Sequence, residues 1–493
     1  MRHGESLSLE AIQSGEIRPF FGADAKSEGR VPLFEFGYLF PREIRDPALR
    51  LPDGRATRDR LIALGCSVAG SERGHESTIP AAYTFLGQFI DHDMTFDAET
   101  RAIKGGIFDA VAAMPPDQVL QGLKNLRTGT LDLDSVYIGA PRDAANPHLL
   151  EVGLVTRKSL RPLGKQDDND VPREPMLPQP GRRPGQARIG DERNDENVIV
   201  SQLNVAFLKF HNALIRNHGM TFDEAQRAVR QHYQWLVLND FLPRVCDVAT
   251  VRSVTRGGPT LLPRDRLFMP LEFSVCAYRF GHSMVRSTHD VNSIFGKASL
   301  AQLFQFVESP NGVGKETPTL GSDWIVDWDR LIDRVRRGQR AMTIDTTMAS
   351  KLLSLPIPHV EPPLNNLAVR NLLRGFLLGM PTGQAVARAL GVAEIAPVDL
   401  LDNAATSLER SALADAGFDE ATPLWYYILA EASIQCGGNS LGQVGSRIVV
   451  ETFVRFVRES ADSILRTPDW RPTLPSTTPG TFTLSDLLAM GGA

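Results

Sequence analysis

The chain lacks several features that would assign it to a particular class of protein. Its four cysteines, Cys66, Cys246, Cys276 and Cys436, lie far apart in the sequence. They predict buried thiols rather than a disulfide scaffold or a cysteine metal site. An excess of basic charge is also lacking, since the formal net charge is -5 and the pI is near 6.1. No basic field is available to gather phosphates, so we do not expect nucleic acid as a partner.

Long hydrophobic runs are absent as well. No stretch approaches the roughly 18 apolar residues that a membrane span needs, and the first residues lack the apolar core of a secretory signal. We therefore expect no membrane span and a protein that is cytoplasmic or exported by a non-classical route. The composition, 42% hydrophobic and 23% charged, is ordinary for a soluble chain that buries a large core, which excludes disorder of the whole chain.

Helical periodicity dominates what is present. Apolar residues recur at intervals of three and four over residues 78–94, 197–217 and 221–238, and the last of these segments begins at a Thr221 cap with Glu224 three residues on. Further helices are predicted near residues 57–64, 300–307, 364–378, 384–390, 424–435 and 446–463. Strand-like alternation is scarce, and residues 157–190 are too rich in proline, glycine and charge for a regular element. The sequence predicts a mainly α fold.

The length of 493 residues would allow about three domains, although large helical enzymes often form one unit. We expect an N-terminal arm over residues 1–77, one catalytic domain over residues 78–475 and a C-terminal tail over residues 476–493.

Four segments carry candidate functional residues. In GQFIDHDMTFD, Gln88, Asp91 and His92 lie within about one helical turn and can face one cavity. A single histidine between acids is usually a surface or capping residue, so this segment indicates a functional site only together with the other segments. GDERNDEN alone is typical of a salt-bridged helix start, and the histidine of AYRFGHSM alone is typical of a satisfied core residue. LAVRNLLRG adds an asparagine and arginines on a predicted helix.

A fifth segment, RTGTLDLDSVYIG, alternates oxygen-bearing side chains. Thr128, Thr130, Asp132 and Asp134 would lie on one side of an extended segment. Hard oxygen ligands of this kind suit Ca²⁺. A solvated edge strand would show the same alternation.

Together, and in their order along the chain, the five segments resemble the animal-type heme peroxidases of the peroxidase–cyclooxygenase superfamily, as a bacterial-like member. The resemblance implies a helical fold around a buried heme b. It implies that His92 is the distal base, that Gln88 contacts peroxide or a halide, and that Arg193 stabilises developing charge.

The resemblance also implies how the heme is held. His282 would ligate the iron, with Asn371 hydrogen-bonded to it and Gly281 allowing close approach of its helix. Arg279 and Arg374 would pair with the heme propionates.

Covalent links and an ion follow from the same resemblance. Asp91 and Glu196 would form esters with the heme, whereas the sulfonium link of some mammalian relatives is not expected because Asn197 stands in place of their methionine. Calcium would clamp the distal helix through five residues. These are Asp93, Thr128, Thr130, Asp132 and Asp134.

The implied activity is reduction of hydrogen peroxide through a ferryl intermediate, with oxidation of small donors such as phenols or halides. A fatty-acid dioxygenase of the cyclooxygenase type is an alternative, but such enzymes carry a tyrosine three residues before the proximal histidine, where this chain has Arg279. Tyr278 is one position off, a rotation of about 100° on a helix. A degenerate heme or calcium binding protein used for interaction is a further alternative. It predicts a missing distal group, yet Gln88, His92 and Arg193 are present.

Overall fold

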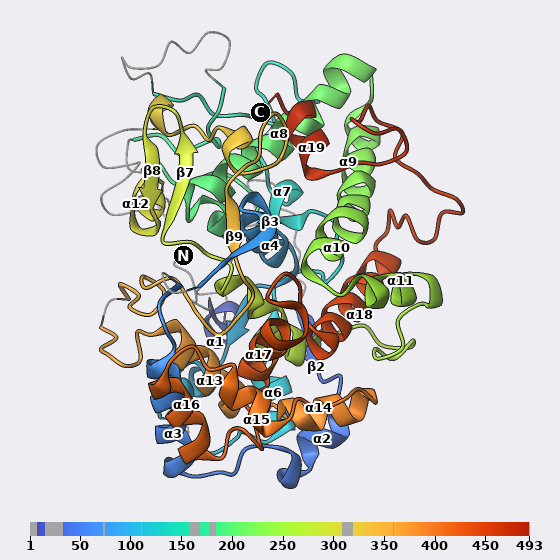
Figure 1. The fold of residues 1–493 in the computed structure, drawn as a ribbon. Helices are drawn as coiled ribbons and strands as arrows, with labels where there is room; N and C mark the ends of the chain where they lie inside the picture. Colours follow the sequence, from blue (N-terminus) through green and yellow to red (C-terminus); the bar gives the residue numbers. More distant parts are fainter. Residues whose placement is uncertain are drawn as a thin grey trace.

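A computed structural model describes residues 7–14, 33–71, 74–109, 111–156, 168–176, 184–307, 319–357 and 359–492. Helices account for most of the regular secondary structure, and the strands are short (Figure 1). The prediction of a mainly α fold is therefore confirmed.

Three helices pack together through aromatic side chains: α4 (Ala82–Met94), α8 (Val198–His218) and α9 (Phe222–Leu236). Helix α8 packs against both of the others. Phe89 of α4 stacks on Phe207 of α8 with ring centroids 4.7 Å apart, and Phe207 meets Tyr233 of α9 edge to face at 5.7 Å. Aromatic packing thus fixes α4 in the core.

Helix α8 is long and apolar enough to cross a membrane by length and composition, which the sequence analysis did not anticipate. However, 83% of its most apolar window is buried inside the protein. It is a core helix, and its apolar character serves packing on all sides.

Helix starts follow local sequence signals closely. The Thr221 hydroxyl accepts a hydrogen bond from the Glu224 backbone N–H, and the Glu224 carboxylate accepts one from the Thr221 backbone N–H. This confirms the predicted capping box. Asn197 is the N-cap of helix α8, and its side chain accepts a hydrogen bond from the Val200 N–H.

The start of the helix that carries His92, predicted over residues 78–94, was placed too early. Residues 76–80 form strand β3 (Glu76–Pro80), which pairs antiparallel with β9 (Arg340–Met342). Helix α4 begins only at Ala82. Pairing with a strand more than two hundred residues away overrides the local helical spacing, because a local pattern carries no information on distant partners.

The remaining predicted helices are all present with shifted ends: α3 (Arg55–Ser67), α12 (Leu300–Gln305), α13 (Leu367–Leu377), α14 (Gly383–Leu390), α17 (Leu424–Cys436) and α18 (Gln443–Glu459). Sequence analysis missed several others, including α5 (Arg101–Asp109), α6 (Pro116–Gly122), α11 (Val248–Gly257), α15 (Pro397–Asp402), α16 (Ser407–Ala416) and α19 (Leu484–Met490). Helix α3 packs against α13, and α19 packs against α8. Both ends of the chain therefore contribute to the packed body.

A small sheet also was not predicted. Its strand order is β1-β4-β5-β2-β6, with β1 (Leu7–Ser8), β4 (Asp97–Glu99), β5 (Leu123–Asn125), β2 (Phe34–Gly37) and β6 (Met269–Pro270). Strand β4 follows α4 directly, so the sheet fixes the chain where it leaves the distal helix.

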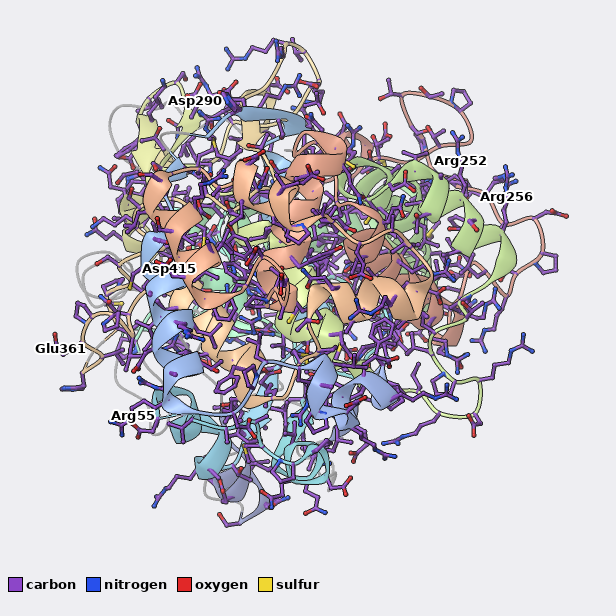
Figure 2. All side chains as sticks on the ribbon, turned by 60° about the horizontal axis from the view of Figure 1, so that its bottom comes forward. Arg55, Arg252, Arg256, Asp290, Glu361 and Asp415 are labelled. Carbon is purple, nitrogen blue, oxygen red and sulfur yellow. The ribbon has the colours of Figure 1, made fainter. Side chains whose placement is uncertain are left out.

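The long loop predicted over residues 157–190 holds no helix in its described parts, 168–176 and 184–190, while residues 157–167 and 177–183 lie outside the described residues. Arg173 anchors it through buried ion pairs with Asp170 and Asp195, both at 2.7 Å. Charged side chains elsewhere cover the outside of the molecule (Figure 2), for example Arg55, Arg252, Arg256 and Asp415.

Candidate active site

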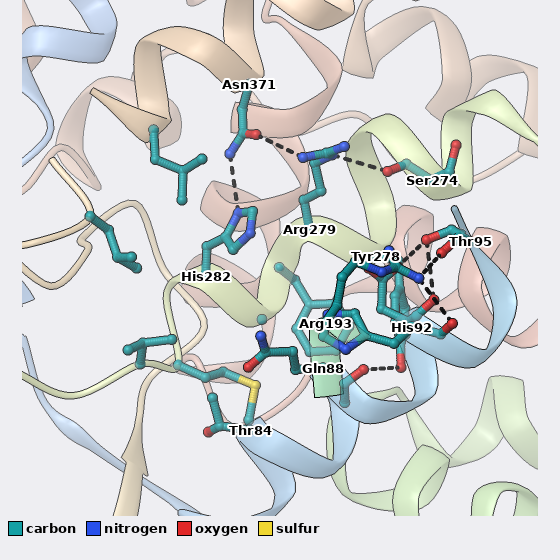
Figure 3. Close-up of a pocket in the computed structure, with 18 of the residues that line it drawn as sticks. Thr84, Gln88, His92, Thr95, Arg193, Ser274, Tyr278, Arg279, His282 and Asn371 are labelled. Atoms are coloured by element: carbon teal, nitrogen blue, oxygen red, sulfur yellow. Dashed lines mark hydrogen bonds between the residues drawn. The ribbon is translucent and has the colours of Figure 1, made fainter. Parts of the chain in front are cut away.

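One cavity of about 450 Å³ lies between α4, the 3₁₀ helix η3 (Glu192–Asp195), the 3₁₀ helix η6 (Ala277–His282) and α13 (Figure 3). Eight of the nine residues predicted to act on peroxide or to hold heme line it: Gln88, Asp91, His92, Arg193, Arg279, His282, Asn371 and Arg374. Glu196 is not among the lining residues, and its neighbour Asn197 is. Segments far apart in the chain therefore converge as expected, apart from Glu196.

Helix α4 supplies the first wall. Gln88, Asp91 and His92 share one face because they lie within about one turn. The Gln88 side chain accepts a hydrogen bond from Asn197 at 3.1 Å. From the other side, the Tyr278 hydroxyl donates to the Gly87 carbonyl at 3.2 Å, which ties α4 to η6.

His92 is held through its main chain and its ring. Its carbonyl accepts from Arg127 Nε at 3.1 Å and from Arg193 Nη2 at 3.0 Å, and its ring Nδ1 lies 2.8 Å from Asn194 Oδ1. Burial, followed by the neighbouring Arg193 guanidinium, lowers the pKa of His92 to about 4. The imidazole is therefore neutral near pH 7 and can accept a proton.

Arg193 is fixed in place by Asp191, the N-cap of η3. Although burial acts in the opposite direction, Arg193 and then Arg127 hold the pKa of Asp191 well below its usual range. Arg193 Nη2 also donates to the Thr95 carbonyl at 2.6 Å. Among the described residues no hydrogen bond engages Nη1, so this end of the guanidinium is available to a ligand in the cavity.

The opposite wall is built from irregular helix. A π-helical turn, η5 (Glu272–Cys276), leads into η6, which carries Arg279 and His282. Gly281 lines the cavity, and a Cβ placed there would meet no described atom within 4 Å. The expectation that Gly281 allows close approach of its helix to the heme stays a prediction, because the space beside Gly281 belongs to the cavity that would hold that group.

Asn371 joins Arg279 and His282. Its Nδ2 lies 3.2 Å from His282 Nδ1, and its Oδ1 accepts from Arg279 Nη1 at 3.4 Å. In this orientation Nδ1 is the acceptor, so a neutral ring carries its proton on Nε2. Turning the amide by half a turn would make Oδ1 the acceptor for Nδ1–H and leave the Nε2 lone pair for a metal.

Three guanidiniums gather on one side of the cavity: Arg279, Arg370 and Arg374. Burial, then Arg279 and Arg374, lowers the pKa of Arg370. Arg374 already forms ion pairs with Asp97 (3.2 Å) and Glu99. The cluster can bind carboxylates, but Arg374 shares its charge with two acids of the protein.

Sequence analysis missed several of these groups. Arg370 and Arg374 are four residues apart on α13 and share a face, a spacing that could have indicated Arg370. Asp97 and Glu99 alternate on β4, but no local signal linked them to Arg374. The contact between Asn194 and His92 also joins distant segments.

The cavity fits a heme in the chemistry of its donors. Two imidazoles and a cationic cluster combine with an apolar lining, as expected for a flat apolar group with acidic substituents. The apolar lining includes Phe85, Phe96, Phe280, Met284, Leu300 and Phe304.

The predicted calcium segment is not extended. Gly129 and Leu133 have φ values of +70° and +57°, and Asp134 begins helix α7 (Asp134–Tyr137). The extended conformation was therefore a wrong prediction, because left-handed residues turn the chain. The turn still gathers Thr128, Thr130 and Asp134: Thr128 Oγ1 lies 3.0 Å from Thr130 Oγ1 and donates to Asp134 Oδ2 at 2.8 Å.

Asp93 of α4 meets this turn. Its carboxylate accepts from the backbone N–H groups of Leu133 (3.2 Å) and Ser135 (3.1 Å). Burial, and then the charge of Asp134, raises the pKa of Asp93. A cation would relieve this repulsion. In the described part of the chain no three histidine, cysteine or acidic side chains could hold a metal alone, so hydroxyl and main-chain oxygens would have to contribute.

Comparison with known sequences gives a family match. The profile of the family "Animal haem peroxidase" matches residues 119–458, more than half of the chain; α4 precedes this region. A peroxidase-like protein of Margaritifera margaritifera is 28% identical over 336 residues, covering 58% of this chain and 41% of that protein. Thyroid peroxidase of Rattus norvegicus is 25% identical over 198 residues, covering 37% of this chain and 21% of that protein. The aligned regions thus span less than half of either relative.

Solved structures share the fold. Peroxidase A from Dictyostelium discoideum superposes with a TM-score of 0.58 at 17% identity, covering 92% of each chain. A fatty acid alpha-dioxygenase from Oryza sativa superposes with a TM-score of 0.54 at 14% identity, covering 87% of this chain and 74% of the other. Such low identities show the fold alone. By its family match, the chain belongs to the animal haem peroxidase family.

Proposed function

We propose that this protein is a heme-dependent peroxidase that reduces hydrogen peroxide and oxidises small donors such as phenols or halides. One observation carries the proposal: in a member of this family, His92, Arg193 and His282 line a single cavity. This combination supplies a base, a fixed cation and a metal ligand.

The cavity residues divide into two groups. His282 would hold the iron through Nε2, and Arg279, Arg370 and Arg374 would bind the propionates. When bound, the heme supplies the redox chemistry of the reaction. The remaining steps are proton transfers and charge stabilisation by the protein.

His92 would move the proton. Its ring is buried and neutral, so it can take the proton from the nearer oxygen of hydrogen peroxide and return it to the farther one, which leaves as water. Arg193 would stabilise the charge that develops on the departing oxygen. Because Asp191 and two carbonyls already fix its guanidinium, little reorganisation is needed.

The structure supports one of the two expected covalent heme links more strongly than the other. Asp91 lines the cavity, which supports it as the residue that would form an ester with the heme. Glu196 does not line it, so an ester there would require its side chain to move. We therefore propose Asp91 as the main site of attachment.

We also propose a structural calcium ion beside α4. The raised pKa of Asp93 and the adjacent hydroxyls of Thr128 and Thr130 support it. Asp132 and Asp134 would complete the ligands. The ion would clamp the helix that carries His92.

A fatty-acid dioxygenase remains a second candidate because Tyr278 lines the same cavity. Its ring stacks on Phe273 with centroids 4.8 Å apart, and its hydroxyl is bonded to Gly87, so the phenol is held beside α4. Fatty acid alpha-dioxygenases are also among the structural neighbours.

One pair of assays on the heme-loaded protein separates the two candidates. The peroxidase proposal predicts oxidation of guaiacol or bromide that depends on added peroxide, with no oxygen uptake on palmitate or a polyunsaturated fatty acid. Oxygen uptake with fatty acid and no guaiacol or bromide oxidation would instead favour the dioxygenase.

A further inference from the structure

We propose that Asn194 is a positioning residue whose side-chain oxygen holds the proton of the His92 imidazole on Nδ1, leaving the lone pair of Nε2 toward the cavity. The proposal rests on the proposed function, in which His92 is the base. It goes beyond that function by assigning the group that selects the reactive form of the ring.

The contact is short and buried. Asn194 Oδ1 lies 2.8 Å from His92 Nδ1, and the two residues are 0% and 2% exposed. Burial of both partners strengthens such a hydrogen bond, because the local dielectric is low. Among the described residues no hydrogen bond engages Nε2 of this ring, which lines the cavity.

A second hydrogen bond orients the Asn194 amide. Its Nδ2 donates to Asn204 Oδ1 of α8 at 3.0 Å. An amide nitrogen donates and does not accept, so this bond turns Oδ1 toward His92. A carbonyl oxygen facing Nδ1 requires a proton on Nδ1, which fixes the tautomer.

The short helix that carries Asn194 explains how its side chain is positioned. Asn194 follows Arg193 on η3, a helix capped by Asp191. Arg193 binds the His92 carbonyl while Asn194 binds the His92 ring. One short helix therefore places the cavity cation and fixes the base, and any shift of η3 would disturb both together.

The chemical consequence concerns the path of the proton. With its proton on Nδ1, the ring accepts the peroxide proton on Nε2 and becomes a positively charged imidazolium. The Nδ1–H group stays hydrogen-bonded to Asn194 in this state. The ring then returns the same proton from Nε2. No net proton is gained. With the opposite tautomer, Nε2 already bears hydrogen and the only lone pair points away from the cavity, so the first transfer fails.

Nitrogen NMR of histidine side chains tests the assignment directly. The full chain, labelled with ¹⁵N-histidine, is examined both without heme and loaded with diamagnetic zinc protoporphyrin IX, and His92→Ala identifies the relevant signals. We expect the wild-type ring to be protonated at Nδ1. Asn194→Ala should show a mixture of tautomers, whereas Asn194→Asp, which keeps an acceptor oxygen, should retain Nδ1–H.

Asn212→Ala is the matched control. Asn212 is also a buried asparagine with two side-chain hydrogen bonds, but its partner is the main chain of Leu150, and it does not line the cavity. This variant should keep the wild-type signals of His92. A wild-type ring protonated at Nε2, or an unchanged tautomer in Asn194→Ala, would overturn the proposal.

Peroxide kinetics give the second readout. Asn194→Ala should lower kcat/KM for peroxide by about tenfold or more, within the usual range of acid–base contributions. Its KM for guaiacol and its Soret absorbance should stay unchanged, and Asn194→Asp should recover part of the rate. If the wild-type protein lacks peroxidase activity, the proposed function fails, while the NMR result still decides the tautomer.

Discussion

His92 and His282 line the same cavity, although one lies on α4 and the other on η6, at distant points of the chain. Each ring has a different asparagine at its Nδ1: Asn194 at 2.8 Å from His92 and Asn371 at 3.2 Å from His282. Each asparagine also contacts a second side chain, Asn204 and Arg279 respectively. Both imidazoles are therefore oriented from behind through their Nδ1 atoms.

Replacement of His92 by alanine tests the proposed base. We expect heme to remain bound and the reaction with peroxide to slow by more than about a hundredfold, because proton transfer is lost. Stopped-flow absorbance after mixing with peroxide measures the rate. His232→Ala removes a buried imidazole outside the cavity and should react at the wild-type rate. An unchanged rate in His92→Ala would argue against the role.

Heme attachment should depend on Asp91 more than on Glu196. Acid-acetone extraction should leave heme on the wild-type protein after turnover with peroxide, because an ester survives denaturation. Asp91→Asn should release it, and Glu196→Gln should retain most of it, since only Asp91 lines the cavity. Complete release from the wild-type protein would contradict the ester.

Removal of calcium should destabilise the fold. A chelator should lower the Tm of the wild-type protein, because the buried carboxylates of Asp93 and Asp134 would then face each other without a cation. Asp134→Asn should reduce this shift. Asp247→Asn alters the N-cap of α11, away from this turn, so the chelator should lower its Tm as much as that of the wild type. A wild-type Tm that is insensitive to the chelator would exclude the ion.

Stability should depend on pH through Glu272. Burial raises the pKa of this carboxyl to about 7 from an ordinary 4.5, although the N–H groups of Leu39 and Phe40 bind it. The protonated carboxyl therefore contributes to the free energy of unfolding in full below 4.5, its pKa in the unfolded chain. This contribution is lost as the pH rises through about 7, its pKa in the folded protein. The loss is on the order of 3 kcal/mol.

Urea unfolding between pH 4.5 and 8 measures this contribution. Glu272→Gln resembles the protonated carboxyl, so its unfolding free energy should fall less with rising pH than that of the wild type. Glu431, whose pKa burial also raises to about 7, remains in both proteins and does not affect the difference. Equal pH dependence of the two proteins would count against the shifted pKa of Glu272.

Local signals predicted the parts of the fold that local interactions determine. The capping box of Thr221 and Glu224 fixed the start of α9, and the spacing of Gln88, Asp91 and His92 indicated one helical face. Strand β3 was missed because its partner, β9, lies far away in the chain. The turn at Leu133 was missed because a left-handed leucine has no sequence signature.

The same distinction holds in the site. Motif order indicated eight of its residues, but the partners that tune them depend on tertiary contacts. Asn194 reaches His92, and Asp97 reaches Arg374, only after distant segments pack. Glu196 shows the converse, since its place beside Arg193 suggested the cavity while the turn of η3 leaves it out of the lining.

The absorption spectrum of the heme-loaded protein, recorded before and after an equimolar addition of peroxide, tests the central claim most directly. The wild-type protein should show a Soret band that changes rapidly with peroxide, whereas His282→Ala should retain heme weakly and show an altered band. A wild-type protein that shows no Soret band after heme supplementation, or a His282→Ala spectrum identical to wild type, would contradict a heme held between His92 and His282.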